Sequence, residues 1–84
     1  MNYKISDDVI EFYLNDNKVG YIICPKENSN LYINKVFVME EFRSMGLASK
    51  MMHEIYNYAI KHNLNLVYNC SYGKAWYEKN SANF

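Results

Sequence analysis

A nine-residue junction between a strand-like and a helix-like segment constrains this chain most. Residues 31–38 are apolar and β-branched, and after the junction small and apolar residues recur at the spacing of one helix face: Ala48, Met52, Ile55 and Ala59. Between them lies Glu40-Glu41-Phe42-Arg43-Ser44-Met45-Gly46-Leu47-Ala48, which holds the only arginine and one of the three glycines. The first N–H groups of a helix lack partners within it and carry partial positive charge. The junction therefore predicts an anion site where a helix begins.

Length and charge narrow the classes of protein to which the chain can belong. Its 84 residues carry nine basic and nine acidic side chains, so nothing attracts nucleic acid or an anionic membrane in general. No apolar run approaches the length of a membrane helix. Cys24 and Cys70 lack metal-ligand spacing, and no charged-then-apolar leader is present, which favours a reducing cytoplasm. We expect one cytoplasmic domain over residues 1–84.

The first half of the chain reads as antiparallel strands. Ile10 to Leu14 alternates apolar and other residues, Asn15 to Lys18 offers turn chemistry, and Val19 to Cys24 resumes an apolar run, which together predict a β-hairpin. After a polar loop, residues 31–38 predict a third strand, with Leu31, Ile33 and Phe37 on one side.

The second half predicts two helices around one more strand. A helix from about Met45 to His62 has Asn63 where a left-handed cap is needed. A strand with Leu64, Leu66, Tyr68 and Cys70 on its apolar side follows, and then a short helix capped by Ser71 and ending at Asn80. Strand, helix and strand in this order favour a parallel pair with a right-handed crossover. We therefore expect a mixed α+β fold of the α/β class: an antiparallel hairpin plus a parallel strand pair around a long helix.

The loop alone cannot supply the binding free energy of a tightly held ligand. A helix N-terminus contributes about 0.3 to 2 kcal/mol per charge, whereas binding at micromolar affinity requires about 8 kcal/mol. A ligand held there needs an extended arm along the strand that ends at Val38. Gly46 leaves the backbone open to phosphate oxygens. The alternative interpretation is that Gly46 is an ordinary loop glycine and Arg43 a surface charge.

Residues 40–48 resemble the acetyl-CoA-binding signature of the GCN5-related N-acetyltransferases, which is Arg or Gln, two variable residues, Gly, one variable residue, then Gly or Ala. Arg43, Gly46 and Ala48 fill its three defining positions. The resemblance implies acetyl-CoA as cofactor, with the CoA pyrophosphate on the backbone of Arg43, Ser44, Met45, Gly46, Leu47, Ala48 and Ser49. It also implies that the pantetheine arm pairs with the backbone of Val36 and Val38.

The C-terminal segment extends this resemblance. Ala75-Trp76-Tyr77-Glu78-Lys79-Asn80 looks like the family helix whose tyrosine protonates the departing CoA thiolate, which implies that role for Tyr77. Asn69-Cys70-Ser71-Tyr72 is similar to a subfamily of small members with a cysteine-serine-aromatic signature, and we place Tyr72 with the cofactor-binding residues. Ser44 departs from the family pattern, which usually has a second glycine there. Lys35-Val36 replaces the subfamily's His-Thr and removes one candidate base.

Several reactive side chains have structural alternatives. Cys70 could accept an acetyl group as a thioester or only line the site, and direct attack by an amine, with Tyr77 as acid and a strand N–H near Val38 holding the oxyanion, is the preferred route. His53 and His62 read as helix-surface residues, and Cys24 as packing without a disulfide. Tyr72, Trp76 and Phe84 could form an aromatic cluster. The acidic pairs at 7–8 and 40–41 lack convergent ligands, so we predict no metal.

These observations predict a minimal GCN5-related domain that transfers an acetyl group from acetyl-CoA to an unidentified amine. The chain lacks the early helical insertion that walls the acceptor side in longer members, so the acceptor could be a protein or peptide. The alternatives are a non-catalytic acetyl-CoA-binding module and a purely structural interaction domain. As an assembly we expect a monomer or a weak dimer.

Overall fold

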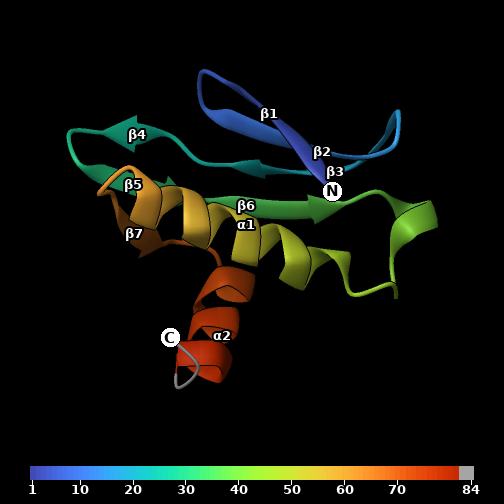
Figure 1. Cartoon of the computed structure of the whole chain (residues 1–84). Helices are drawn as coiled ribbons and strands as arrows, with labels where there is room; N and C mark the ends of the chain where they lie inside the picture. The colour runs from blue at the N-terminus through green and yellow to red at the C-terminus, as the bar shows by residue number, and fades with distance from the viewer. Residues whose placement is uncertain (82–84) are drawn as a thin grey trace.

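The computed structural model describes residues 1–81, which form two small sheets and two helices (Figure 1). The four-stranded sheet has the order β1-β2-β3-β6, with β1 at Asn2–Ser6, β2 at Val9–Leu14, β3 at Asn17–Ile23 and β6 at Lys35–Val38, and all its pairs are antiparallel. The three-stranded sheet has the order β4-β5-β7, with β4 at Lys26–Glu27, β5 at Asn30–Ile33 and β7 at Asn65–Tyr68.

Three helical segments complete the described part of the fold. The 3₁₀ turn η1 covers Glu40–Phe42, the long helix α1 covers Leu47–Lys61 and the short helix α2 covers Ser71–Asn80. Figure 1 shows α1 lying against the strands, roughly along β6, and α2 running away from the end of β7. The mixed α+β fold, with an antiparallel hairpin, a parallel pair and a long helix, is thus confirmed.

The hydrophobic core lies between α1 and the strands. Phe12, Val19 and Ile22 are fully buried on the sheet side. On the helix side the buried residues are Leu47, Met51, Met52, Ile55 and Ala59. The sequence predicts that the buried face of this helix consists of Ala48, Met52, Ile55 and Ala59. The last three are buried, whereas Ala48 is only half-buried and its neighbour Leu47 is buried in its place.

Residues 31–38, predicted as one strand, form two, because the chain bulges at Asn34. The Asn34 N–H donates to the Ile23 carbonyl at 2.9 Å, and Ile23 is also the register partner of Lys35, so two residues oppose one. The bulge reverses the side to which the following residues point. Phe37, predicted to lie with Leu31 and Ile33, instead stacks on Tyr21 with ring centroids 5.1 Å apart, while Val36 and Val38 pack against the core.

The first strand was not predicted, because β1 is an edge strand whose residues are all exposed. Asp7 and Asp8 form the turn that joins β1 to β2, and the ring of Tyr3 lies 6.0 Å from that of Phe12. The two-residue strand β4 was also missed. The acidic pair at 7–8 therefore has a local structural role.

The parallel pair β5–β7 ends where the two strands diverge. Leu31 lies opposite Leu66 and Ile33 opposite Tyr68, after which the N–H groups of Asn69 and Cys70 both donate to the Ile33 carbonyl. Beyond this point β6 pairs only with β3 and is an edge strand of its sheet. The predicted parallel pair is confirmed, and β6 is left with one unpaired edge on the side of α2.

Candidate functional site

The loop before α1 presents a run of backbone donors. In the part of the chain that the structure describes, no acceptor is bound by the N–H groups of residues 44 to 49. The N–H groups on either side of this run do have partners: the Arg43 N–H donates to the Glu40 carbonyl, and the Lys50 N–H donates to the Gly46 carbonyl. These six consecutive N–H groups stand at the positive end of a 15-residue helix.

A cavity of about 260 Å³ lies against this loop, between β6, α1 and α2. It is lined by Val38, Phe42, Arg43, Ser44, Gly46, Leu47, Ala48, Ser49 and Tyr72. The structure thus brings together eight of the residues singled out from the sequence. Phe42 was missed because nothing in the sequence marks it as more than a loop residue. Val36, Met45, Cys70 and Tyr77 are not among the lining residues.

The Arg43 side chain ties the base of the loop to β6. Its Nε donates to the Val38 carbonyl at 2.9 Å, and its guanidinium carbon lies 5.2 Å from the centroid of the Phe37 ring. A cation over an aromatic face contributes about 0.5 to 1 kcal/mol at an exposed site. Arg43 therefore holds the loop in place as well as lining the cavity.

The backbone of β6 points toward the cavity side at alternate residues. The Met39 N–H donates to the Val19 carbonyl at the end of β3. Because the backbone groups alternate in direction along a strand, the N–H and C=O groups of Lys35 and Phe37 also point toward β3. The N–H and C=O groups of Val36 and Val38 consequently point away from β3, toward the gap where β7 diverges. An extended ligand arm could pair with this edge.

Two residues of the loop have left-handed backbone. Gly46 has φ 72° and Ser44 has φ 71°. A Cβ at Gly46 would meet no atom within 4 Å, so space does not restrict this position. Glycine is favoured there because it adopts a positive φ without strain, and it leaves the cavity mouth open. The same requirement at Ser44 explains why the related signature usually has a second glycine at this position.

We expect Ser44→Gly to stabilise the protein. A left-handed non-glycine residue costs about 1 to 2 kcal/mol, and the entropy that glycine adds to the unfolded chain offsets about 0.4 to 1 kcal/mol of this gain. The thermal midpoint should rise by a few degrees, measured by circular dichroism. Ser44→Ala keeps the strain and is the control, and an equal rise in that variant would refute the explanation.

Aromatic residues of α2 close one side of the site. Trp76 is buried, and its Nε1–H donates to the Ser49 Oγ at 3.0 Å, which joins α2 to the first turn of α1. The His53 ring lies edge-on to the Trp76 ring at 4.9 Å. Tyr72 is 40% exposed, and burial raises the pKa of its hydroxyl. Phe84, predicted as part of this cluster, lies outside the described residues.

The cysteines differ in their surroundings. Cys70 caps α2, in place of the predicted Ser71, because its Sγ accepts a hydrogen bond from the Gly73 N–H at 3.2 Å. Cys24 is buried, and burial raises the pKa of its thiol to about 11. Neither is in a disulfide. Cys70 is half-buried at the point where β5 and β7 diverge, so it is the more accessible of the two thiols.

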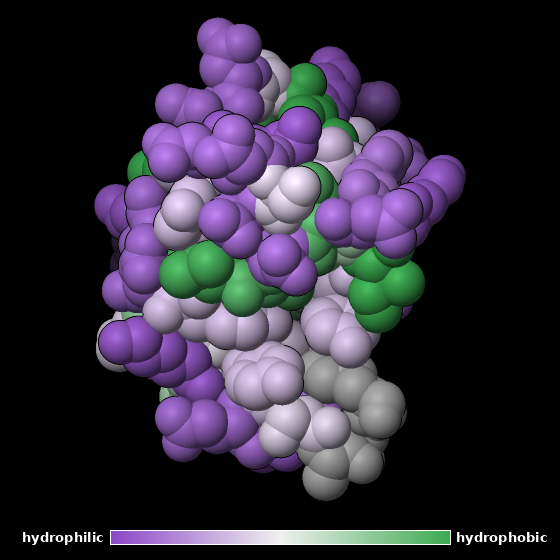
Figure 2. Space-filling model, turned by 90° about the vertical axis from the view of Figure 1, so that its left-hand side faces the viewer, coloured by the Kyte–Doolittle hydropathy of each residue, from purple (hydrophilic) through white to green (hydrophobic). Residues whose placement is uncertain are grey.

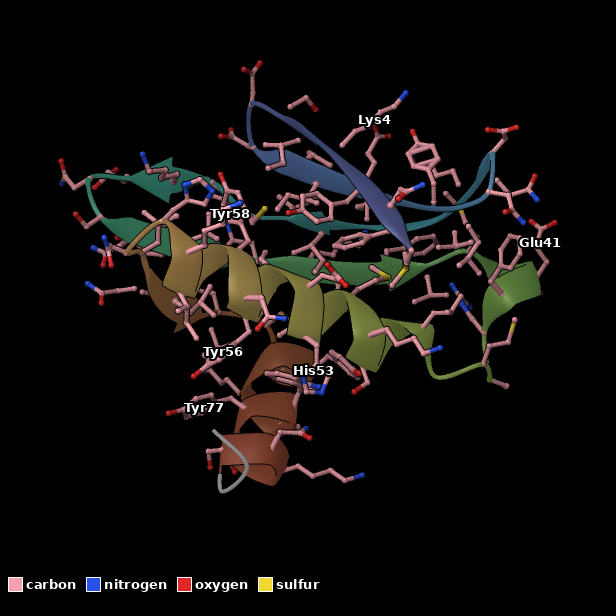
Figure 3. The ribbon with its side chains drawn as sticks, in the orientation of Figure 1. Lys4, Glu41, His53, Tyr56, Tyr58 and Tyr77 are labelled. Atoms are coloured by element: carbon pink, nitrogen blue, oxygen red, sulfur yellow. The ribbon has the colours of Figure 1, made fainter. Side chains whose placement is uncertain are left out.

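Tyr77 lies away from the loop cavity. It lines a different cavity of about 420 Å³, together with Tyr56 and Tyr68, and its ring lies 5.1 Å from that of Tyr68. Figure 3 shows Tyr56 and Tyr77 on the same side of the molecule, at the opposite end from Glu41 of the loop. Burial, and then the nearby Tyr77 and Tyr56, raise the pKa of Tyr68 to about 12. Tyr77 therefore lies outside the loop cavity, and its role as the acid stays a prediction.

This second cavity opens on a partly apolar surface. Ile60, which is 59% exposed, lines it with Leu64 and Leu66. Figure 2 shows that side of the molecule, where apolar residues lie among hydrophilic ones.

The remaining side chains with potential chemistry lie apart from the loop. His53 and His62 are exposed on α1 or just beyond it, as predicted. Within residues 1–81, no group of three His, Cys, Asp or Glu side chains is placed to hold a metal ion. No helix among these residues is long and apolar enough to cross a membrane.

Comparison with solved structures finds the same fold in proteins of distant sequence. A GCN5-like protein from Staphylococcus aureus, solved by NMR, matches with a TM-score of 0.74 and 20% identity, over 96% of this chain and 81% of that chain. An integron cassette protein from the mobile metagenome of V. cholerae matches with a TM-score of 0.60 and 20% identity, over 88% of this chain and 51% of that chain. Curated protein sequences give no significant match.

The sequence itself also matches a family. Residues 2–83 match the family described as GCN5-related N-acetyl-transferase, which covers nearly the whole chain and includes the loop, the long helix and α2. The chain therefore belongs to the GCN5-related N-acetyltransferase family.

Proposed function

We propose that the protein binds acetyl-CoA and transfers its acetyl group to an amine. The observation that carries this proposal is the run of unpartnered N–H groups from residues 44 to 49, which borders a cavity reached by the free edge of β6. A pyrophosphate is the anion that such a helix start accommodates. The cofactor supplies an acetyl group activated as a thioester.

The residues present fit a CoA-like molecule. The open space at Gly46 lets phosphate oxygens approach the backbone, and the outward N–H groups of Val36 and Val38 offer pairing for an amide-bearing arm. The Val38 carbonyl is held by Arg43, so the Val38 N–H and the Val36 backbone provide the pairing groups. Tyr72 walls the cavity opposite the loop. Together these contacts would supply the additional binding free energy that the loop alone lacks.

For the chemical step we propose direct attack by the acceptor amine: its nitrogen bonds to the acetyl carbon, a β6 N–H stabilises the oxyanion, and the C–S bond then breaks. CoA leaves as a thiolate that takes a proton from Tyr77, and the proton of the attacking nitrogen passes to solvent. Cys70 stands where β5 and β7 diverge, at the end of the β6 edge, and lines the approach to the thioester. We further propose that the acceptor is a protein or peptide and that the protein works in the cytoplasm, where its two free thiols remain reduced.

A second function, binding acetyl-CoA without turnover, is favoured by one observation. The His-Thr of the related subfamily is Lys35-Val36 in this chain, and neither histidine lines the loop cavity, so the usual general base is missing. Tyr77 lies in the other cavity. A carrier or sensor would need only the binding surface.

The two functions differ in the release of free CoA. An enzyme should release CoA from acetyl-CoA faster when the right amine is added, from a panel of amines, peptides and cell extract, and Gly46→Glu should remove this release. We propose Tyr77 as the acid that protonates the departing thiolate, so Tyr77→Phe should slow this release at least severalfold. A rate that stays within about twofold would refute this role of Tyr77, and no acceleration across the panel would favour the binding module.

Mass spectrometry decides the role of Cys70. Direct attack predicts that mixing with acetyl-CoA leaves the protein mass unchanged and that Cys70→Ala still releases CoA. A labile acetyl adduct that is absent from Cys70→Ala would instead establish a route through a thioester on Cys70.

A further inference from the structure

A second hollow continues the loop cavity along α2. Its volume is about 240 Å³, and it shares Ser49 and Tyr72 with the loop cavity. Beyond these two residues it is bounded by Ala75, Trp76, Lys79 and Asn80. A molecule whose pyrophosphate lies at the loop can therefore extend past Tyr72 into this hollow without leaving the surface of the protein.

Both charged side chains among the described residues that line the two hollows are basic. Lys79 is the only charged residue among the described residues that line the second hollow, and Arg43 is the only one that lines the loop cavity. The single salt bridge within residues 1–81 joins Lys18 to Glu11, so Lys79 has no carboxylate partner in that range. An ammonium group on a flexible stem beside a hollow is a typical partner for a phosphate group.

The lining also suits a nucleoside. Tyr72 stands at the boundary between the two hollows with 40% of its surface exposed, so its ring offers a face against which a base can stack. The Asn80 Nδ2 donates to the Trp76 carbonyl at 2.9 Å, which fixes the amide group at the far wall. The hydrogen bond from Trp76 to Ser49 fixes the floor between α1 and α2.

We propose that this second hollow binds the nucleoside end of the cofactor and that Lys79 pairs with the phosphate on its ribose. CoA carries this third phosphate at the 3′ position, beyond the pyrophosphate. Lys79 would then make the protein select CoA over 3′-dephospho-CoA. This inference rests on the proposed function, because it requires the pyrophosphate to lie at residues 44–49.

Calorimetric titration with CoA and with 3′-dephospho-CoA tests the inference. The native protein should bind CoA about tenfold more tightly, which is the effect of one charge-assisted contact to phosphate. Lys79→Met keeps the side-chain stem and should bring the two affinities within about twofold, by weakening CoA and leaving 3′-dephospho-CoA unchanged. The preference should also shrink as salt is raised. Lys74→Met is the matched control, because Lys74 is exposed on the same helix but lines neither hollow.

The outcomes separate this inference from the function on which it rests. Equal affinities for the two ligands in the native protein, or an equal loss of both in Lys79→Met, would overturn the role of Lys79 while leaving acetyl-CoA binding intact. A loss of preference in Lys74→Met as large as in Lys79→Met would show a general effect of charge and would also overturn it. Failure of the native protein to bind either ligand would overturn the proposed function and the inference together.

Discussion

Replacing Gly46 with glutamate should weaken acetyl-CoA binding by about a hundredfold or more while the protein remains folded. A side chain at Gly46 projects into open space, since nothing lies within 4 Å of a Cβ built there. The carboxylate would stand where the pyrophosphate must approach, and repulsion between charges about 4 Å apart costs about 1 to 4 kcal/mol near a protein surface. A hundredfold change in affinity corresponds to about 3 kcal/mol. Calorimetry with acetyl-CoA measures it directly.

Gly46→Gln separates charge from backbone strain. Any side chain at φ 72° costs about 1 to 2 kcal/mol of stability, so the two variants should share the same fall in thermal midpoint. Only the glutamate should show the large loss of affinity, with the glutamine at least tenfold better. Equal affinities in the two variants would mean that the pyrophosphate does not lie at Gly46.

The second large effect is expected from Gly20→Ala, which should cost about 3 kcal/mol of unfolding free energy. Gly20 is buried in β3 opposite Val38, and a Cβ there would lie 2.4 Å from the Phe37 carbonyl oxygen, which is backbone and cannot give way cheaply. β6 would have to move away from β3, which displaces the edge that borders the loop cavity. Chemical denaturation should show the loss, and the thermal midpoint should fall by more than about 10 °C.

Gly73→Ala is the matched control, since Gly73 is also buried. A Cβ there would meet the Cys70 Sγ at 3.1 Å and a Tyr68 ring carbon at 3.2 Å, both in side chains that can adjust. Alanine also gains about 0.8 to 1 kcal/mol over glycine within a helix. The net change should stay within about 1 kcal/mol. If Gly20→Ala were as mild as Gly73→Ala, the close approach of β3 and β6 would be refuted.

The loop and the long helix could be predicted because their signals are local. Apolar spacing defines the buried face of α1, and Asn63 adopts the predicted left-handed backbone with φ 56°. The start of α1 shifts from Met45 to Leu47 because Gly46 is itself left-handed and cannot belong to the helix. The signature residues of the loop needed no tertiary information, since their donors belong to the backbone.

Strand pairing could not be predicted in the same way, because it depends on residues far apart in sequence. Nothing local shows that Asn34 opposes Ile23 and reverses the sides of the residues that follow, so Phe37 was placed on the wrong side. The position of Tyr77 likewise depends on tertiary contacts. Cys70 caps α2 and Trp76 is buried against α1, and Tyr77, about 100° further around the helix, then faces Tyr68.

Titration of ¹⁵N-labelled protein with acetyl-CoA, followed by NMR, measures the backbone donors one by one. The free N–H groups of residues 44 to 49 should show the largest shifts and saturate together, with Val36 and Val38 shifting at the same ligand concentration. Saturable binding that leaves the amide signals of residues 44 to 49 unmoved would contradict the account.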